Sequence, residues 1–222
     1  AETVTSYEAG FKSAVSDPLS WSLAAFYQDY DAPQARIFVS FDLPDGSTII
    51  SNSLSNLDEA TAYGLEVSGR WSPLKNLDLD AGVTFLETEI SQTNDLGGNA
   101  ALFDGNALPF ASDVTGRLSA RYTRAVTDDV SAIATVSAKY NGAFYLDAEG
   151  LETRRQDSYT LLDASLALRF DQNGLEVGLW GRNLLNEDYA TSGYGFIGYN
   201  TFRSEPATYG VRLRYEFQST TG

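Results

Sequence analysis

Cysteine, histidine and methionine are absent from all 222 residues of the chain. Without cysteine there is no disulfide framework and no thiolate metal site. Without histidine the chain lacks the commonest general base and the commonest metal ligand, which excludes a Ser-His-Asp triad, a Cys-His pair and a histidine-based zinc site. We therefore expect no catalytic residues, no bound metal and no cofactor, and a protein that is not an enzyme.

Long apolar runs are missing as well. No stretch of about 18 apolar residues could cross a bilayer as a helix. A strand of a membrane barrel needs only about 9–11 residues with every second one apolar, a pattern that average hydropathy does not reveal. The chain begins at Ala1 without the charged start and apolar middle of a leader peptide, which predicts either a processed protein or a piece of a longer one.

Positive charge is scarce, since 15 Lys and Arg residues face 30 Asp and Glu residues for a net charge of −15. Phosphate recognition needs clustered cations, so nucleic acid is not an expected partner. The acidity is most simply that of solvated loops, and a vestibule that attracts cations is the alternative interpretation.

What the chain does have is alternation of apolar and polar residues, most clearly at Tyr209–Phe217. Tyr and Phe dominate an aromatic content of 13%, which suits strands and the aromatic girdles of membrane barrels. One such strand fits a soluble sheet with one buried face, or a barrel wall with lipid outside and a polar lumen inside. The two faces of this strand carry Tyr209, Val211, Leu213, Tyr215 and Phe217 on one side, and Gly210, Arg212, Arg214 and Glu216 on the other.

The same period of two predicts nine strands along the chain. A further hairpin is expected within the first long connection, from Arg36–Phe41 and Ser47–Leu54 around Pro44-Asp45-Gly46. The nine strands are expected at Ser6–Lys12, Leu19–Tyr30, Thr61–Trp71, Leu77–Glu87, Val114–Thr123, Val130–Tyr140, Leu162–Phe170, Leu175–Arg182 and Tyr209–Phe217.

Short turns and long connections alternate between these strands. Asp171–Gly174 contains Asn-Gly, which predicts a hairpin turn of type I′. Short turns on one side and long loops on the other are typical of an outer-membrane barrel, and the layout favours a single all-β, antiparallel transmembrane β-barrel unit over a soluble sandwich. Nine strands place the two ends on opposite sides, whereas bacterial barrels have even strand numbers, so we expect about nine or ten strands of a larger barrel. The long connections are Asp31–Ala60, Thr88–Asp113, Asn141–Thr160 and Asn183–Thr208.

Five segments in this order resemble the C-terminal half of the barrel of TonB-dependent outer-membrane receptors, and they cover nearly the whole chain. They are Thr5–Ser13 (similar to SYE-x-G-x-K), Ala62–Val67 (YG-x-E), Leu108–Ala111 (LP-x-x-P), Gly181–Tyr189 (NL-x-N/D-x-x-Y) and Glu205–Phe217 (the closing strand).

The resemblance implies a barrel of 22 strands in the bacterial outer membrane, plugged by a separate domain that lies outside residues 1–222. It implies uptake of a scarce large nutrient, such as a siderophore, with energy passed on by the TonB system. It also implies contact with outer-membrane lipid, and with a barrel-assembly machinery that reads Tyr215 and Phe217. The chain departs from the pattern because Gln218–Gly222 follow Phe217, and because no second proline stands near Ser112.

Two groups of residues are candidates for function. The Gly-rich stretch 193–198 matches G-x-G-x-x-G but lacks a following helical pattern, so a nucleotide site is not expected. This stretch and the residues that follow it offer aromatic anchors and an arginine for ligand contact, at Tyr194, Phe196, Tyr199, Phe202 and Arg203. Charges on the polar faces predict a wet lumen, with Arg117, Arg121, Lys139, Arg169, Glu176, Arg182, Arg212 and Arg214 pointing inward.

Two alternatives remain open on the sequence. A small self-contained pore or structural barrel would need the extra hairpin in Asp31–Ala60 to supply closing strands. A soluble β-sandwich binding module would need the apolar faces to pack against each other.

Overall fold

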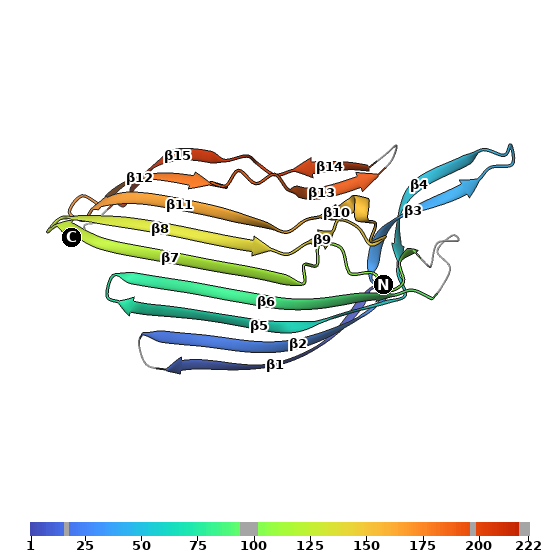
Figure 1. Cartoon of the computed structure of the whole chain (residues 1–222), viewed down its shortest axis with the longest axis horizontal. Coiled ribbons are helices and arrows are strands. Elements are labelled where there is room, and N and C mark those ends of the chain that lie inside the picture. Colours follow the sequence, from blue (N-terminus) through green and yellow to red (C-terminus); the bar gives the residue numbers. More distant parts are fainter. Residues whose placement is uncertain (16–17, 94–101, 196–198, 218–222) are drawn as a thin grey trace.

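The chain folds into one curved antiparallel sheet of nine strands, with small hairpins at one end (Figure 1). The computed structural model describes residues 1–15, 18–93, 102–195 and 199–217. Each predicted strand is present, and neighbours in the sheet follow chain order. The nine strands are β1 (Thr3–Val15), β2 (Leu19–Asp31), β5 (Glu59–Leu74), β6 (Leu77–Ser91), β7 (Val114–Thr127), β8 (Val130–Asn141), β11 (Tyr159–Phe170), β12 (Leu175–Arg182) and β15 (Thr208–Tyr215).

The hairpins lie where β1 begins, at the right in Figure 1, and the short turns lie at the opposite end. The predicted hairpin is confirmed as β3 (Gln34–Asp42) and β4 (Thr48–Asn56). It forms a two-stranded sheet of its own and adds nothing to the wall, unlike the closing strands that a self-contained barrel needs. Two further hairpins were not predicted: β9 (Phe144–Tyr145) with β10 (Arg155–Gln156), and β13 (Ala190–Gly195) with β14 (Tyr199–Arg203). A 3₁₀ turn, η2 (Glu152–Arg154), precedes β10.

Among the described residues, no helix is long and apolar enough to cross a membrane.

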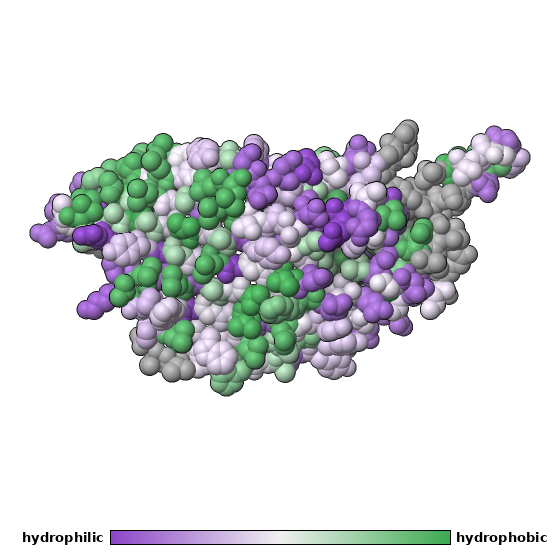
Figure 2. Space-filling view, viewed as in Figure 1, coloured by the Kyte–Doolittle hydropathy of each residue, from purple (hydrophilic) through white to green (hydrophobic). Residues whose placement is uncertain are grey.

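The outer face of the sheet exposes its apolar side chains. Leu213 is 72% exposed, Leu166 56% and Val136 46%, while Leu79 on the same face is half-buried. In a soluble β-sandwich these side chains would be covered by a second sheet. The sandwich alternative is therefore wrong, and the surface of the strands presents the hydrophobic residues seen in green in Figure 2.

Aromatic side chains mark both borders of this apolar face, as interfacial girdles do. On β2, Tyr27 lies six residues beyond Trp21, or about 20 Å along a strand. Tyr27 stacks on Tyr63 of β5 with ring centroids 6.4 Å apart. The border near the loops carries Tyr7, Tyr27, Tyr63, Phe85, Tyr140 and Tyr209, and the border near the turns carries Trp21, Trp71, Tyr122, Phe170 and Tyr215.

Between the aromatic border near the loops and the loops themselves, the outer face becomes acidic. The exposed acidic residues there are Asp29, Asp31, Glu59, Glu87 and Glu89. This change explains why several strands are longer than predicted at that end. Backbone pairing continues into the charged region, where Thr61 still pairs with Glu89, although the apolar alternation that predicted the strands has stopped.

The packed core lies on the inner face at the loop end rather than in the middle of the sheet. Phe103 and Ile90 are the largest fully buried side chains, and they pack with Leu57, Ala60 and Ala148. A second cluster joins Phe144, Leu146 and Ala190. These clusters fasten the long connections to the mouth of the wall.

Two local predictions are wrong. Only Gly174 has a positive φ (63°) in the turn 171–174, so this is a four-residue connection and not a type I′ turn at Asn-Gly. The last strand ends at Tyr215 rather than Phe217, which is 88% exposed, although Glu216 still donates its backbone N–H to the Gly174 carbonyl.

Candidate functional site: the inner wall and its mouth

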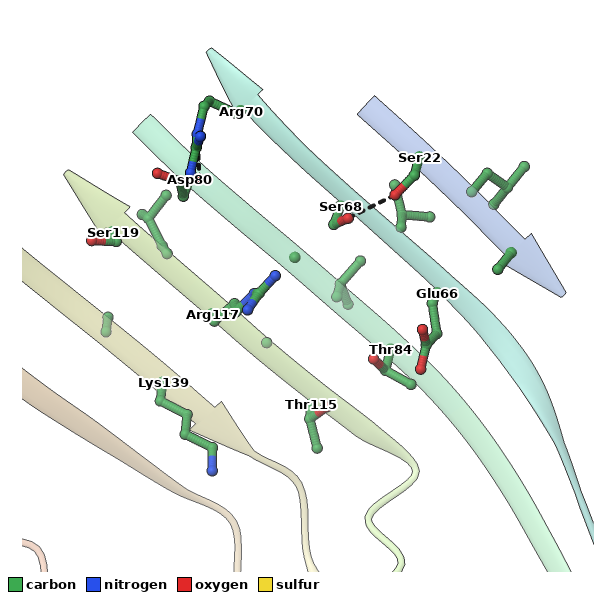
Figure 3. A pocket seen from close by; sticks show the side chains of 18 of the residues that line it. Ser22, Glu66, Ser68, Arg70, Asp80, Thr84, Thr115, Arg117, Ser119 and Lys139 are labelled. Carbon is green, nitrogen blue, oxygen red and sulfur yellow. Dashed lines mark hydrogen bonds and ion pairs between the residues drawn. The ribbon is translucent and has the colours of Figure 1, made fainter. Parts of the chain in front are cut away.

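The inner face of the sheet borders a hollow of 1410 Å³, where charged and hydroxyl side chains stand among aliphatic ones (Figure 3). Arg70 Nε donates to Asp80 Oδ1 over 3.0 Å, and the hydroxyls of Ser22 and Ser68 share a hydrogen bond of 2.8 Å. Arg117 lies across Gly82, because a Cβ on that glycine would be 3.0 Å from Arg117 Nε. The inner wall therefore carries charged and hydroxyl side chains, unlike the apolar outer face.

A second hollow, of 430 Å³, opens near the short turns. Arg169 Nε contacts Asp171 Oδ1 at 2.8 Å, and Arg214 Nη2 contacts Glu216 Oε1 at 2.6 Å. These pairs are exposed, so each contributes little to stability.

The predicted inward charges lie on the inner wall at two heights. Arg117 and Lys139 line the large hollow, and Arg121, Arg169, Glu176 and Arg214 line the second one. Arg182 lies over the ring of Trp180, 5.3 Å from its centroid, and Arg212 stands opposite Gly178. Trp180 itself belongs to the inner face and covers Gly210, a cross-strand contact that the alternation pattern alone did not predict. What these charges bind stays a prediction.

The predicted ligand-contact residues do not form one exposed cluster. Phe196 lies outside the described residues, and of Tyr194 the structure describes only the backbone, which pairs with Asn200. Phe202 is 58% exposed. Arg203 Nε donates to Asp188 Oδ1 over 2.7 Å, which holds the pKa of Asp188 below its ordinary value. Tyr199 turns inward onto the second buried cluster. A strand, β14, follows the G-x-G-x-x-G match, so no helix N-terminus is present there for a phosphate.

Tyr199 takes part in a charged cluster that the sequence did not predict. The guanidinium of Arg154 pairs with Asp147 Oδ2 at 2.9 Å and with Glu149, and it lies 4.8 Å from the centroid of the Tyr199 ring. Burial raises the pKa of Tyr199 to about 12, and burial also raises the pKa of Glu149. The cluster joins β14 to the segment between β9 and β10.

Asn183 ties the end of β12 to the start of β15. It is 8% exposed, has a φ of 49°, and its Nδ2 donates to the carbonyls of Glu187 and Glu205 at 2.9 and 3.0 Å. Its Oδ1 accepts the backbone N–H of Glu187, and its own N–H donates to Asp163 Oδ1. Asparagine tolerates a positive φ better than most residues, so both backbone and side chain explain its place in the motif.

A third hollow, of 470 Å³, lies at the mouth beside these loops. Its walls hold four aromatic residues in two pairs. Tyr159 stacks on Tyr189 with ring centroids 4.1 Å apart, and Phe110 lies 5.7 Å from Phe144. The remaining lining residues are Ser112, Thr115, Lys139, Asn141, Ala190 and Thr191. Alternation had placed Lys139 on the inner wall, but no local pattern predicted that the aromatic residues would gather beside it.

Among the described residues, no group of three or more acidic side chains is placed to hold a metal ion.

Comparison with known proteins gives consistent results. The family model described as "TonB dependent receptor-like, beta-barrel" matches residues 1–184. The pesticin receptor of Yersinia pestis is 25% identical over 200 residues, and that of Yersinia enterocolitica 26%; both alignments cover 87% of this chain and 26% of the relative. The chain thus spans about a quarter of the length of these relatives.

Solved structures show the same fold. The ferric yersiniabactin uptake receptor FyuA from Yersinia pestis has a TM-score of 0.78 at 22% identity, over 98% of this chain and 30% of that one. The ferric preacinetobactin receptor BauA from Acinetobacter baumannii has a TM-score of 0.67 at 19% identity, over 95% and 28%. The wall of antiparallel strands, apolar outside and polar within, is part of an outer-membrane β-barrel, and the chain belongs to the family of TonB-dependent receptors.

Proposed function

We propose that this chain is part of a receptor that binds a scarce metal chelate or a nutrient of similar size outside the cell and admits it through the barrel, driven by the TonB system. The observation that carries the proposal is the contrast between the two faces of the sheet. Exposed apolar side chains cover the outside, while a charged hollow of 1410 Å³ occupies the inside. Binding and gated passage need such a lumen, and they need no bond chemistry.

The relatives support the choice of cargo. Their names refer to ferric yersiniabactin uptake, ferric-catecholate import and ferric citrate transport, and one is a copper transporter. Metal chelates are therefore the class to test first.

The same proposal includes the missing parts of the molecule. Residues 1–222 would be the C-terminal part of a barrel of 22 strands, and the plug domain that contacts TonB would lie outside them. The wall would contact outer-membrane lipid through its aromatic borders, and the assembly machinery would read Tyr215 and Phe217 at the end of β15. These two rings already contact each other edge to face, with centroids 4.8 Å apart.

Uptake measurements test the proposal. Cells that carry the full-length protein as their sole receptor of this kind should accumulate a labelled ferric chelate, and a protonophore or loss of TonB should abolish the accumulation. Accumulation that continues without TonB would identify a passive pore. A protein that fractionates away from the outer membrane would contradict the proposal altogether.

A further inference from the structure

The hollow at the mouth has the size and composition of a small-molecule site. Its 470 Å³ fall within the roughly 300–1,000 Å³ of typical ligand pockets, and aromatic walls with a few polar groups are characteristic of them. The 1410 Å³ hollow exceeds this range, so it is too large to hold one small group tightly. The mouth hollow is therefore the better candidate for recognition.

Its aromatic walls are held in place before any ligand arrives. Phe144 is buried at 7% exposure, packed with Leu146 and Ala190. Tyr159 accepts a hydrogen bond of 2.6 Å from Asn141 Nδ2 while its ring stacks on Tyr189. Phe110 is 50% exposed, so its ring can contact a ligand that binds beside Phe144. Rigid rings of this kind lose little entropy on binding a flat partner.

One cation accompanies these rings. Lys139 lines both the mouth hollow and the large hollow, and among the described residues no carboxylate forms an ion pair with it. Its cross-strand partner on β7 is Arg117, another cation. Figure 3 shows the Lys139 side chain extending away from Arg117, on the side of Thr115. A cation beside a like charge favours an anion as its partner.

From this arrangement we propose that the mouth hollow binds a ligand group that combines a flat aromatic ring with an adjacent anionic oxygen. The ring packs between Phe110, Phe144 and the Tyr159–Tyr189 stack, and the oxygen meets Lys139. Phenolate or catecholate groups of a metal chelate have this chemistry, whereas aliphatic carboxylate chelates lack the ring. The inference rests on the proposed function and narrows its cargo.

Two ferric chelates distinguish these ligand chemistries. The ferric complex of 2,3-dihydroxybenzoate supplies the aromatic ring with anionic oxygens, and ferric citrate supplies only aliphatic carboxylates. Binding to the purified full-length receptor is followed by quenching of intrinsic fluorescence and checked by calorimetry. We expect the aromatic chelate to bind at least about tenfold more tightly than ferric citrate. Equal affinities, or a preference for citrate, overturn the inference while leaving uptake as a function.

Variants assign the preference to the hollow. Lys139→Gln should weaken the aromatic chelate about tenfold, as the loss of one charge-assisted contact does. Lys75→Gln, which neutralises an exposed lysine near the short turns, serves as the matched control and should bind like the wild type. Lys139→Gln indistinguishable from Lys75→Gln would refute the site.

To test the aromatic rings, a substitution of Tyr189 has to be compared with one that keeps the ring, because Tyr189 also packs on Tyr159. Tyr189→Leu should weaken the aromatic chelate and leave ferric citrate unchanged, and Tyr189→Phe should restore the wild-type preference. If both variants bind like the wild type, the ring does not contact the ligand. If both chelates weaken equally in Tyr189→Leu, the ring only supports the loops, and the assignment fails as well.

Discussion

The guanidinium of Arg154 lies over the ring of Tyr199, 4.8 Å from its centroid, while the hydroxyl of that tyrosine is buried without a hydrogen-bond partner among the described residues. The ring therefore stabilises the loops and the hydroxyl does not. Tyr199→Phe should leave stability unchanged or raise it by about 1 kcal/mol, since it removes a buried polar atom that no partner satisfies.

Tyr199→Leu should instead cost about 1–2 kcal/mol, because it removes the cation–π contact and part of the second buried cluster. Hydrogen exchange of the β13–β14 amides in the full-length protein measures both effects, with β7 amides as an internal reference. Faster exchange in the phenylalanine variant than in the leucine variant would contradict the geometry.

Tyr199 also predicts a pH effect. Its pKa is raised from 10.0 to about 12, chiefly by burial and then by the charge of Asp147. Between these values the open loop ionises and the packed loop does not, so the packed form loses stability as pH rises from 10 towards 12. The wild type should show β13–β14 exchange accelerating over this window beyond the ordinary chemical rate, and Tyr199→Phe should lack that increment. A larger increment in the variant would place the effect on another group.

The wall and the mouth differ in how far the sequence predicts them. The nine strands follow from a local period of two, so the pattern found each of them and missed only their ends, near the turns in β1, β5 and β7 and near the loops in several others. At the loop ends the outer face carries residues such as Asp29 and Glu87, and pairing persists without apolar alternation. The type I′ turn predicted at 171–174 was wrong because Asn-Gly only favours that turn type. The four-residue connection that forms instead needs a positive φ at Gly174 alone.

The mouth depends on contacts between distant segments, and these leave no periodic signal. Gln156 Oε1 accepts the backbone N–H of Ala190 across 34 residues, which joins β10 to β13. The stack of Tyr159 on Tyr189 likewise joins the start of β11 to the connection between β12 and β13. Aromatic and charged residues in long connections indicated that the loops matter, but their partners follow only from the fold.

Substitutions of Arg203 and Asp188 can show whether Arg203 contacts the ligand or only stabilises its loop. Their ion pair is exposed, so breaking it should cost at most about 1 kcal/mol. If Arg203 contacts ligand as predicted, Arg203→Ala should weaken chelate binding, and Asp188→Asn should preserve or strengthen it by freeing the guanidinium. Titration calorimetry on both variants decides. Equal losses of affinity would show that the pair merely positions the loop.

Replacing Asn183, which follows β12, should lower the stability of the folded protein substantially. Asn183→Ala removes the side-chain bonds to Glu187 and Glu205 and places a less tolerant residue at φ 49°. The lost bonds are half-buried, and the Glu187 carbonyl keeps the Ser204 hydroxyl as a donor, so we expect a loss of about 1–3 kcal/mol. Asn173→Ala in the exposed turn is the matched control and should change stability by less than about 0.5 kcal/mol. Urea unfolding in detergent provides the comparison, and similar midpoints for both variants would contradict this assignment.

Gly64 tests whether the wall tolerates any side chain at a crowded cross-strand position. A Cβ there would approach the Phe85 carbonyl oxygen to 2.1 Å and Phe26 Cζ to 2.9 Å, and a backbone atom cannot move aside cheaply. Gly116 is the matched control, since a Cβ at that glycine meets nothing closer than 3.9 Å. Gly64→Ala should destabilise the wall by about 3 kcal/mol and lower the fraction of heat-modifiable, folded protein in the outer membrane, whereas Gly116→Ala should assemble normally. Because both changes add one methyl group to a strand, equal assembly of the two variants would show that β5 and β6 are further apart at Gly64 than the register requires.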